Sequence, residues 1–384
     1  MKPADRCEAI TPFIVMEIME KIHKMEAAGI DVIHMEIGEP DFNVPECVSQ
    51  SSIEAFSNNK THYTHSLGDI RLREAISQYH ADTYGTRIDP GHIVVTSGTS
   101  PAMLLLFSAL INPGDEVIVS DPHYACYENF INYVQGVPVL VPVFEEEGFI
   151  YTPEAIQKKI TPRTRAIFIN SPANPTGTVI SKERMQQIVD IAAASNLMII
   201  SDEIYHGLVY EGKEHSILEF TDKAFVLNGF SKLFAMTGLR LGYLISPPEF
   251  IRAIQVLQQN FFICANSIAQ IAGVAALKDA AQETAAMKER YNRRRLYMID
   301  RLKKMGFNIK VEPTGAFYVF VNANHICNDS YALAVDILEK AHVGVTPGID
   351  FGTNGEGFLR FSYANSMANL KIGLDRMEGY LKGL

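Results

Sequence analysis

The sequence has few cysteines, and they lack the spacings in which cysteines usually act together. Five cysteines are scattered over 384 residues without a CxxC pair. This spacing argues against both a zinc site and a disulfide framework. We therefore expect reduced thiols in a cytoplasmic protein, and no bound metal.

Long apolar runs and a basic excess are also missing. No run approaches the roughly 18 apolar residues of a membrane helix, and residues 1–11 lack the apolar core of a secretory signal. The chain carries 34 basic and 44 acidic residues, a formal net charge of −10. This balance disfavours binding to nucleic acid or to an anionic membrane. We interpret the one basic cluster, Arg293 to Arg295, as a solvated helix face, and expect a soluble protein that binds small molecules.

Apolar content is high, at 47%, and short β-branched runs alternate with helical patterns. The runs are continuous rather than alternating, which indicates strands covered on both faces. Helices between such strands predict an α/β fold with a mostly parallel sheet sandwiched by helices. The predicted strands are residues 93–96, 116–119, 166–169, 197–200, 224–227 and 241–245.

The pattern changes after about residue 280. A charged helical pattern over 283–305 is followed by predicted strands at 315–321 and 358–363. This alternation is typical of a smaller α+β domain. We predict a large domain over residues 46–280 and a small domain formed by residues 1–45 and 281–384.

Polar residues follow five of the predicted strands. The carboxyl ends of parallel strands lie at one edge of the sheet, where open α/β sheets bind ligands. Five polar clusters are therefore expected to face one crevice. They lie at residues 96–100, 121–124, 170–177, 202–205 and 228–240.

The last cluster contains Ser231, Lys232 and Arg240. An amine at the end of a buried strand, near positive charge, is suited to forming a Schiff base with an aldehyde. A hydroxyl and a guanidinium beside it are the groups that bind a phosphate. Pyridoxal phosphate carries an aldehyde and a phosphate on one ring, so this segment could bind it at two points. The alternative is that Lys232 is a surface residue in a loop, which is the more common case for a lone lysine.

The other clusters have ordinary alternatives. Gly98, Thr99 and Ser100 begin a predicted helix, where backbone N–H groups bind anions, although Thr99 or Ser100 could simply cap that helix. The segment 174–177 could be a plain turn. Asp202 could bind Mg²⁺ in a nucleotide hydrolase, but the chain has no GxxxxGKS/T loop.

Taken together, these segments resemble the class I/II aminotransferases, the fold-type I pyridoxal-phosphate enzymes of the aspartate aminotransferase-like superfamily. The resemblance covers nearly the whole chain. It rests on Gly38-Glu39-Pro40-Asp41-Phe42, Tyr63 with residues 68–73, Asn174-Pro175-Thr176-Gly177, Asp202-Glu203-Ile204-Tyr205, Ser231-Lys232 through Arg240, and residues 347–352 and 359–362.

The resemblance assigns the cofactor site. It implies that Lys232 forms the Schiff base and shuttles the substrate proton, and that Asp202 keeps the pyridine nitrogen protonated, which improves the ring as an electron sink. Tyr205 and Asn174 would bond the phenolic oxygen, and Tyr124 would lie on the ring face. The phosphate would be held by Gly98, Thr99, Ser100, Ser231 and Arg240.

The resemblance also assigns the substrate site and a partner. Arg360 would bind the substrate α-carboxylate as a bidentate pair, helped by Asn174 and the backbone at Gly38. Without the resemblance, Arg360 could equally form a structural ion pair. Tyr63 would reach the phosphate of a neighbouring subunit, which implies a homodimer with a shared active site.

The chain departs from the family pattern in two places. Gly229 stands where a serine is frequent, so one phosphate hydroxyl is missing. No second basic residue is assignable to a distal substrate carboxylate, which favours an apolar side-chain pocket. Its candidate wall residues are Phe13, Ile14, Phe261 and Phe262, and His206 is interpreted as packing.

We therefore predict an aminotransferase that passes the α-amino group of an L-amino acid to a 2-oxo acid through pyridoxal 5′-phosphate, in a ping-pong reaction. One alternative is a pyridoxal-phosphate β-lyase that cleaves cysteine conjugates or cystathionine. A regulatory module fused to a DNA-binding domain is disfavoured, because residues 1–37 contain no helix-turn-helix pattern.

Overall fold

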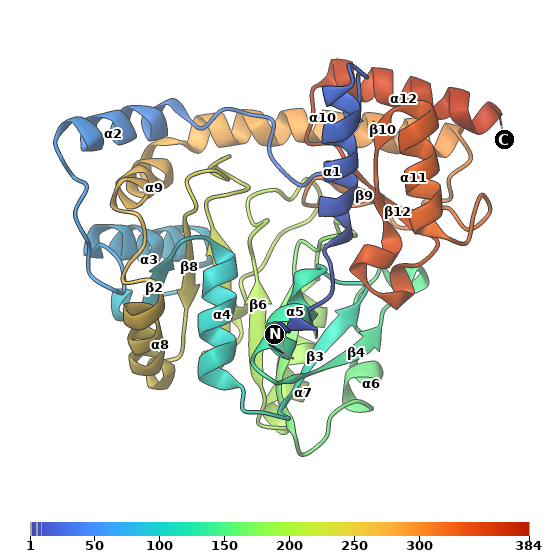
Figure 1. The fold of residues 1–384 in the computed structure, drawn as a ribbon. Coiled ribbons are helices and arrows are strands. Elements are labelled where there is room, and N and C mark those ends of the chain that lie inside the picture. Colours follow the sequence, from blue (N-terminus) through green and yellow to red (C-terminus); the bar gives the residue numbers. More distant parts are fainter. Residues whose placement is uncertain (1, 5–6, 9, 384) are drawn as a thin grey trace.

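The computed structural model describes residues 2–4, 7–8 and 10–383, and a seven-stranded sheet lies at its centre (Figure 1). The order across the sheet is β2-β8-β7-β6-β5-β3-β4. β8 is antiparallel to both neighbours, and the other paired strands are parallel. The strands are β2 (Ile93–Thr96), β3 (Glu116–Asp121), β4 (Val137–Pro142), β5 (Thr164–Asn170), β6 (Met198–Asp202), β7 (Ala224–Gly229) and β8 (Gly242–Ile245).

Helices cover both faces of this sheet, so successive strand residues enter different cores. In β6, for example, Ile199 belongs to the cluster that contains Ile76 of α3, whereas Ile200 belongs to the cluster that contains Leu105 of α4. This burial on both faces explains the continuous apolar runs and confirms the predicted α/β fold. The surrounding helices are α2 (Glu46–Ser57), α3 (Ile70–Tyr84), α4 (Thr99–Leu110), α5 (Cys126–Tyr133), α6 (Pro153–Gln157), α7 (Lys182–Ala194), α8 (Pro248–Phe261) and α9 (Ser267–Asp279).

A second group of elements lies beside the large sheet, to the upper right in Figure 1. Its antiparallel sheet has the order β11-β12-β9, and a separate pair joins β1 to β10. These strands are β1 (Ile33–His34), β9 (Tyr318–Asn322), β10 (Val343–Gly344), β11 (Thr346–Pro347) and β12 (Phe358–Ser362). The helices are α1 (Ile14–Ala27), α10 (Ala281–Lys304), α11 (Ser330–Ala341) and α12 (Met367–Lys382).

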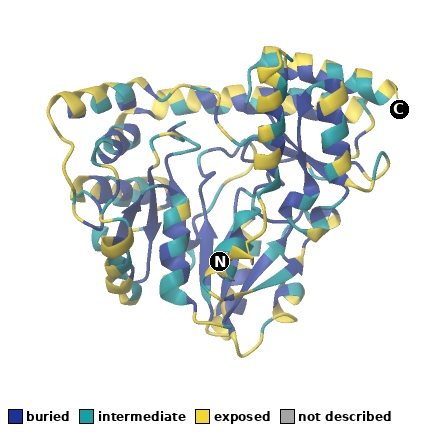
Figure 2. Ribbon diagram, viewed as in Figure 1, coloured by how far each residue is buried: buried dark blue, intermediate teal, exposed yellow. Residues whose placement is uncertain are grey.

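This second group has its own apolar core, in which α10 and α12 pack over the strands. Figure 2 shows the resulting pattern, with buried strands and helices exposed on their outer sides. Short 3₁₀ turns complete the fold at 90–92, 145–147, 217–219, 348–351 and 353–355. The predicted domain boundaries near residues 45 and 280 stay a prediction, although the second coincides with the α9–α10 junction.

Two local predictions differ from the structure. The sequence did not predict β4, because Pro138 and Pro142 weaken its strand pattern; prolines are tolerated there because β4 is an edge strand. The strand expected over 315–321 begins only at Tyr318. No helix among the described residues is long and apolar enough to cross a membrane.

The interpretation of the basic cluster on α10 was wrong for two of its three residues. Arg293 is exposed, but Arg294 is buried and donates to both oxygens of Asp41, at 2.6 and 2.9 Å. Arg295 is also buried and donates to the Pro313 carbonyl at 2.7 Å. Both partners lie outside α10. The helix is therefore buried on faces that its charge pattern predicted to be exposed to solvent.

Candidate active site

The strands that precede the five polar clusters all run in the same direction, so their carboxyl ends open at one edge of the large sheet. At this edge lies a cavity of about 240 Å³, between the sheet, α1 and the antiparallel strands. The predicted residues that line it are Gly38, Thr99, Ser100, Tyr124, Asn174, Asp202, Tyr205, Ser231, Lys232, Arg240 and Arg360.

Lys232 lies just beyond β7 and points into this cavity. Its Nζ donates to the Gly38 carbonyl at 2.6 Å. Burial lowers the pKa of Lys232 to about 8, although Glu39 acts in the opposite direction. Arg360 and Arg240 lower this pKa further through charge repulsion. A neutral, nucleophilic amine is therefore accessible near physiological pH.

Glycine at position 38 allows this contact. A Cβ at Gly38 would lie 1.9 Å from the Tyr318 hydroxyl oxygen, so no other residue fits without displacing that ring. The backbone can therefore pass close enough for its carbonyl to accept from Lys232.

Asp202 ends β6 and is fully enclosed. Its Oδ2 accepts from the Tyr127 hydroxyl at 2.7 Å, and its Oδ1 accepts from the Ile204 backbone N–H at 3.1 Å. Burial raises the pKa of Asp202 to about 6, despite these two bonds. A buried carboxylate with fixed orientation is suited to pairing with a cationic ring nitrogen, which would restore its ionised form.

An anion site lies at the start of α4. Gly98 occupies its N-cap position with φ +95°, and no side chain caps the helix. The alternative of capping by Thr99 or Ser100 is therefore not observed, and the first-turn N–H groups remain without a side-chain acceptor. Arg240 adds a positive charge, since a Cβ at Gly98 would lie 2.6 Å from its NH2.

Arg360 lies in the middle of β12 and is 3% exposed. Its NH1 donates to Asn174 Oδ1 at 2.8 Å, and its NH2 donates to Thr346 Oγ1 at 3.0 Å. NH2 also donates to the Glu36 carbonyl. The guanidinium lies 4.3 Å from the centre of the Tyr318 ring, and its Nε has no hydrogen-bond partner among the described residues. Such a buried, forked cation suits a carboxylate.

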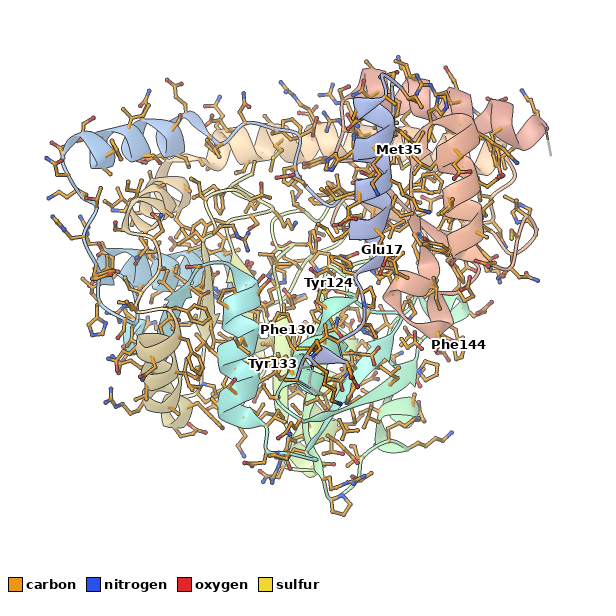
Figure 3. All side chains as sticks on the ribbon, in the orientation of Figure 1. Glu17, Met35, Tyr124, Phe130, Tyr133 and Phe144 are labelled. Atoms are coloured by element: carbon orange, nitrogen blue, oxygen red, sulfur yellow. The ribbon has the colours of Figure 1, made fainter. Side chains whose placement is uncertain are left out.

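Two tyrosines that the sequence did not single out complete the cavity. Tyr318 of β9 shares a 2.8 Å hydrogen bond with the Tyr205 hydroxyl, and Tyr127 of α5 bonds Asp202. Tyr127 lies three residues after Tyr124, in the first turn of α5, and this short separation could have indicated it. Figure 3 shows Tyr124 below the lower end of α1. No sequence signal indicated Tyr318, because its partner Tyr205 is 113 residues away, in the turn that follows β6.

Several predicted residues lie elsewhere. Tyr63 is 80% exposed and does not line the cavity of the single chain. Of the four candidate wall residues, Phe13 lines the cavity, but Ile14, Phe261 and Phe262 do not. They were predicted from their apolar character alone, which does not give the direction of a side chain.

The two remaining sequence questions have structural answers. A Cβ at Gly229 would lie 3.0 Å from both Gly242 Cα and the Leu241 carbonyl oxygen, so close strand packing disfavours a serine there. His206 is buried, and its Nδ1 lies 2.8 Å from the Tyr84 hydroxyl, consistent with a packing role.

The residues around the cavity fit pyridoxal phosphate. Three features surround one space: the uncapped start of α4, the partly buried amine of Lys232 and the buried carboxylate of Asp202. They match the phosphate, the aldehyde and the ring nitrogen. The forked cation of Arg360 adds a place for a substrate carboxylate.

Comparisons with known proteins agree with this geometry. The family of class I and II aminotransferases matches residues 30–377. A (5-formylfuran-3-yl)methyl phosphate transaminase of Methanocaldococcus jannaschii is 43% identical, with 96% of each chain covered. An aspartate aminotransferase of Pyrococcus horikoshii is 39% identical, over 99% of this chain and 97% of the relative. The structure of Thermus thermophilus aspartate aminotransferase with maleate superimposes with a TM-score of 0.95, at 35% identity and 99% coverage of both chains.

Proposed function

This chain belongs to the class I and II aminotransferases and transfers amino groups; we propose that it does so with pyridoxal 5′-phosphate, between an L-amino acid and a 2-oxo acid. The observation that carries the cofactor proposal is the joint position of Lys232, Asp202 and the uncapped start of α4 around one cavity. No single one of these features would specify the ligand.

When bound, the cofactor supplies an aldehyde that condenses with amines and a ring that draws electrons from the substrate α-carbon. Asp202 would hold a proton on the ring nitrogen. Lys232 Nζ would act as the base that takes the proton from the substrate α-carbon, since its lowered pKa makes a neutral amine available. Tyr205 and Asn174 would bond the ring oxygen, and Tyr124 would pack on the ring face.

Substrate orientation would come from Arg360. Its two terminal nitrogens are already aligned by Asn174 and Thr346, so the guanidinium plane is fixed before a carboxylate arrives. Fixed orientation of the substrate lowers the entropic part of the barrier. The buried setting also strengthens the pairing of charges.

The Lys232→Ala protein tests this proposal. We expect it to fold, to lose the visible absorbance of the lysine-bound cofactor and to lose transamination. Lys223→Ala is the matched control, because Lys223 lies in the same region of sequence but is exposed. Near wild-type turnover in Lys232→Ala would contradict the proposal.

The alternative of a β-lyase predicts a different product. A lyase would release pyruvate from a cysteine conjugate without an added 2-oxo acid, whereas a transaminase needs an amino acceptor. The relatives are named as transaminases and aminotransferases, which supports transfer. Stoichiometric pyruvate release without an acceptor would favour the lyase.

A homodimer is proposed from the surface around Tyr63. Exposed apolar side chains lie on α2, at Ile53 and Phe56, and at the end of α8 and just after it, at Phe261 and Ile263. α2 packs against α9, which follows the second segment, and Ser267 Oγ at the start of α9 donates to the Lys60 carbonyl. Exposed apolar side chains grouped in this way are typical of an interface. We expect a dimer in analytical ultracentrifugation, and weaker cofactor affinity in Tyr63→Phe if Tyr63 reaches a partner's phosphate.

The compartment is a further proposal. All five cysteines are free. Free thiols support a reducing compartment such as the cytoplasm.

A further inference from the structure

The wall of the cavity formed by α1 is apolar. Phe13, Val15, Met16 and Met19 all line the cavity from this side. Met16 is 49% exposed although it is a large apolar residue, so it lies at the mouth rather than in a core. Of these four residues, only Phe13 was among the wall residues predicted from the sequence.

The N-terminal turn of α1 is held close to Arg360. Asp350 accepts from the backbone N–H groups of Ile14 at 2.8 Å and Val15 at 3.2 Å, in place of a capping side chain on the helix itself. Asp350 follows β11, and in that strand Thr346 pairs with Arg360. The apolar wall is therefore fixed relative to the guanidinium that would hold the substrate carboxylate.

The other end of this wall lies against the expected cofactor position. The Phe13 ring packs edge-on to the Tyr124 ring, with centres 5.8 Å apart. The start of α1 thus contacts Tyr124 through Phe13 and the 3₁₀ turn 348–351 through the bonds to Asp350. A substrate bound by its carboxylate at Arg360 would direct its side chain along these residues.

Positive charge in the cavity is already assigned. Of the described residues that line it, only Lys232, Arg240 and Arg360 are cationic. They serve the aldehyde, the phosphate and the α-carboxylate. Among the lining residues of one chain, a second carboxylate on the substrate would therefore meet apolar side chains of α1 without a cationic partner, which is unfavourable.

We propose that this enzyme selects amino donors with uncharged, apolar side chains, and that Phe13, at the N-cap of α1, and Met16 and Met19, on α1, recognise them. This inference rests on the proposed function. Methionine side chains are flexible and polarizable, so they adapt to ligands of different shape. Straight, branched and aromatic apolar side chains should all be accepted, and those with a terminal carboxylate should be disfavoured.

The test uses the holoenzyme and pairs of donors of similar size. Conversion of the cofactor from its aldehyde to its amine form is followed by absorbance with methionine against glutamate, and leucine against aspartate, without any acceptor. We expect the apolar member to react with an at least about tenfold higher second-order rate constant for this half-reaction, because a buried unpaired carboxylate is costly. Equal or faster reaction of glutamate and aspartate, for example through a partner subunit's cation, would overturn the inference.

A binding measurement separates this inference from the proposed function. The dissociation constant of unreactive 4-methylpentanoate should be at least about tenfold lower than that of glutarate in titration calorimetry. If no amino acid converts the cofactor at all, the proposed function fails. If amino acids react but glutarate binds more tightly, only the present inference fails.

Two variants test the role of α1. Met16→Ala and Met19→Ala should each lower the ratio of kcat/KM for leucine to kcat/KM for alanine at least about threefold, because the side chain of alanine is too short to reach the wall. Ile372→Ala is the matched control, since Ile372 is 45% exposed on α12 and does not line the cavity. Unchanged discrimination between leucine and alanine in both methionine variants would overturn the assignment to α1.

Discussion

Replacement of Arg360 by lysine would keep the charge of the substrate site but remove its fork. The guanidinium presents NH1 toward Asn174 and NH2 toward Thr346, between the rings of Tyr318 and Phe351. A lysine ammonium is a compact group that occupies only one of these positions. The variant should therefore lose one of the two charge-assisted hydrogen bonds to the substrate carboxylate.

The expected loss follows from that one bond. A hydrogen bond to a charged group contributes about 1.5–3 kcal/mol. Since about 1.4 kcal/mol corresponds to a factor of ten, kcat/KM should fall roughly 10- to 150-fold in Arg360→Lys. Arg360→Ala leaves the carboxylate without a partner, a loss of about 3–5 kcal/mol, so its kcat/KM should fall more than roughly 100-fold.

The assay compares leucine with 3-methylbutylamine, which has the same side chain but no carboxylate. Conversion of the cofactor to its amine form is measured for both compounds. The loss should be confined to leucine, because only leucine contacts Arg360. An equal loss with the amine, or an unchanged rate with leucine, would refute the assignment.

Stability must be measured in parallel, because Arg360 also bonds the Glu36 carbonyl. Thermal unfolding of the variants identifies any general loss of structure. Arg301→Lys is a suitable control, since Arg301 pairs with Asp375 at 2.7 Å on the outer side of α10. Arg301→Lys should leave unchanged the ratio of the rate with leucine to the rate with 3-methylbutylamine.

Three further predictions concern the cofactor site. Burial raises the folded-state pKa of Asp202 to about 6, so the cofactor-free protein should lose stability as pH rises from about 4 to 6. Asp202→Asn should then increase the free energy of unfolding by up to about 3 kcal/mol at pH 7 but by little at pH 4. A variant that is less stable than the wild type in denaturant unfolding at pH 7 would contradict this. Capture of pyridoxal phosphate by the cofactor-free protein should rise with pH with a midpoint near 8, the pKa of Lys232, and a stopped-flow midpoint above 10 would argue against a neutral buried amine. Gly98→Ala should weaken cofactor affinity at least about tenfold in fluorescence titration, because Gly98 has φ +95° and its Cβ would displace Arg240; unchanged affinity would remove Arg240 from the phosphate site.

The sequence predicted the large sheet because its strands are buried on both faces, as Ile199 and Ile200 illustrate. It could not predict β4, whose edge position tolerates the prolines that weaken its pattern. Nor could it predict that Arg294 is buried, since its partner Asp41 is 253 residues away.

The sequence also predicted some residues of the candidate site and missed others. Residues that follow strands, such as Asp202 and Lys232, were predicted because the sheet topology alone brings them together. Tyr318 and Met16 were missed, because their places depend on how elements outside the sheet pack against it. The reach of Tyr63 toward a partner stays a prediction, since it depends on a second chain.

The two cationic side chains that would handle the substrate are both held by main-chain oxygens of one short segment, Glu36 for Arg360 and Gly38 for Lys232. Side-chain exchange at positions 36 and 37 therefore leaves these two acceptors in place, and alanine substitutions at these two positions would not reveal them. Ile37 also lines the cavity. Substitutions at position 37 can therefore change the donor preference while both main-chain hydrogen bonds, to Arg360 and to Lys232, are kept.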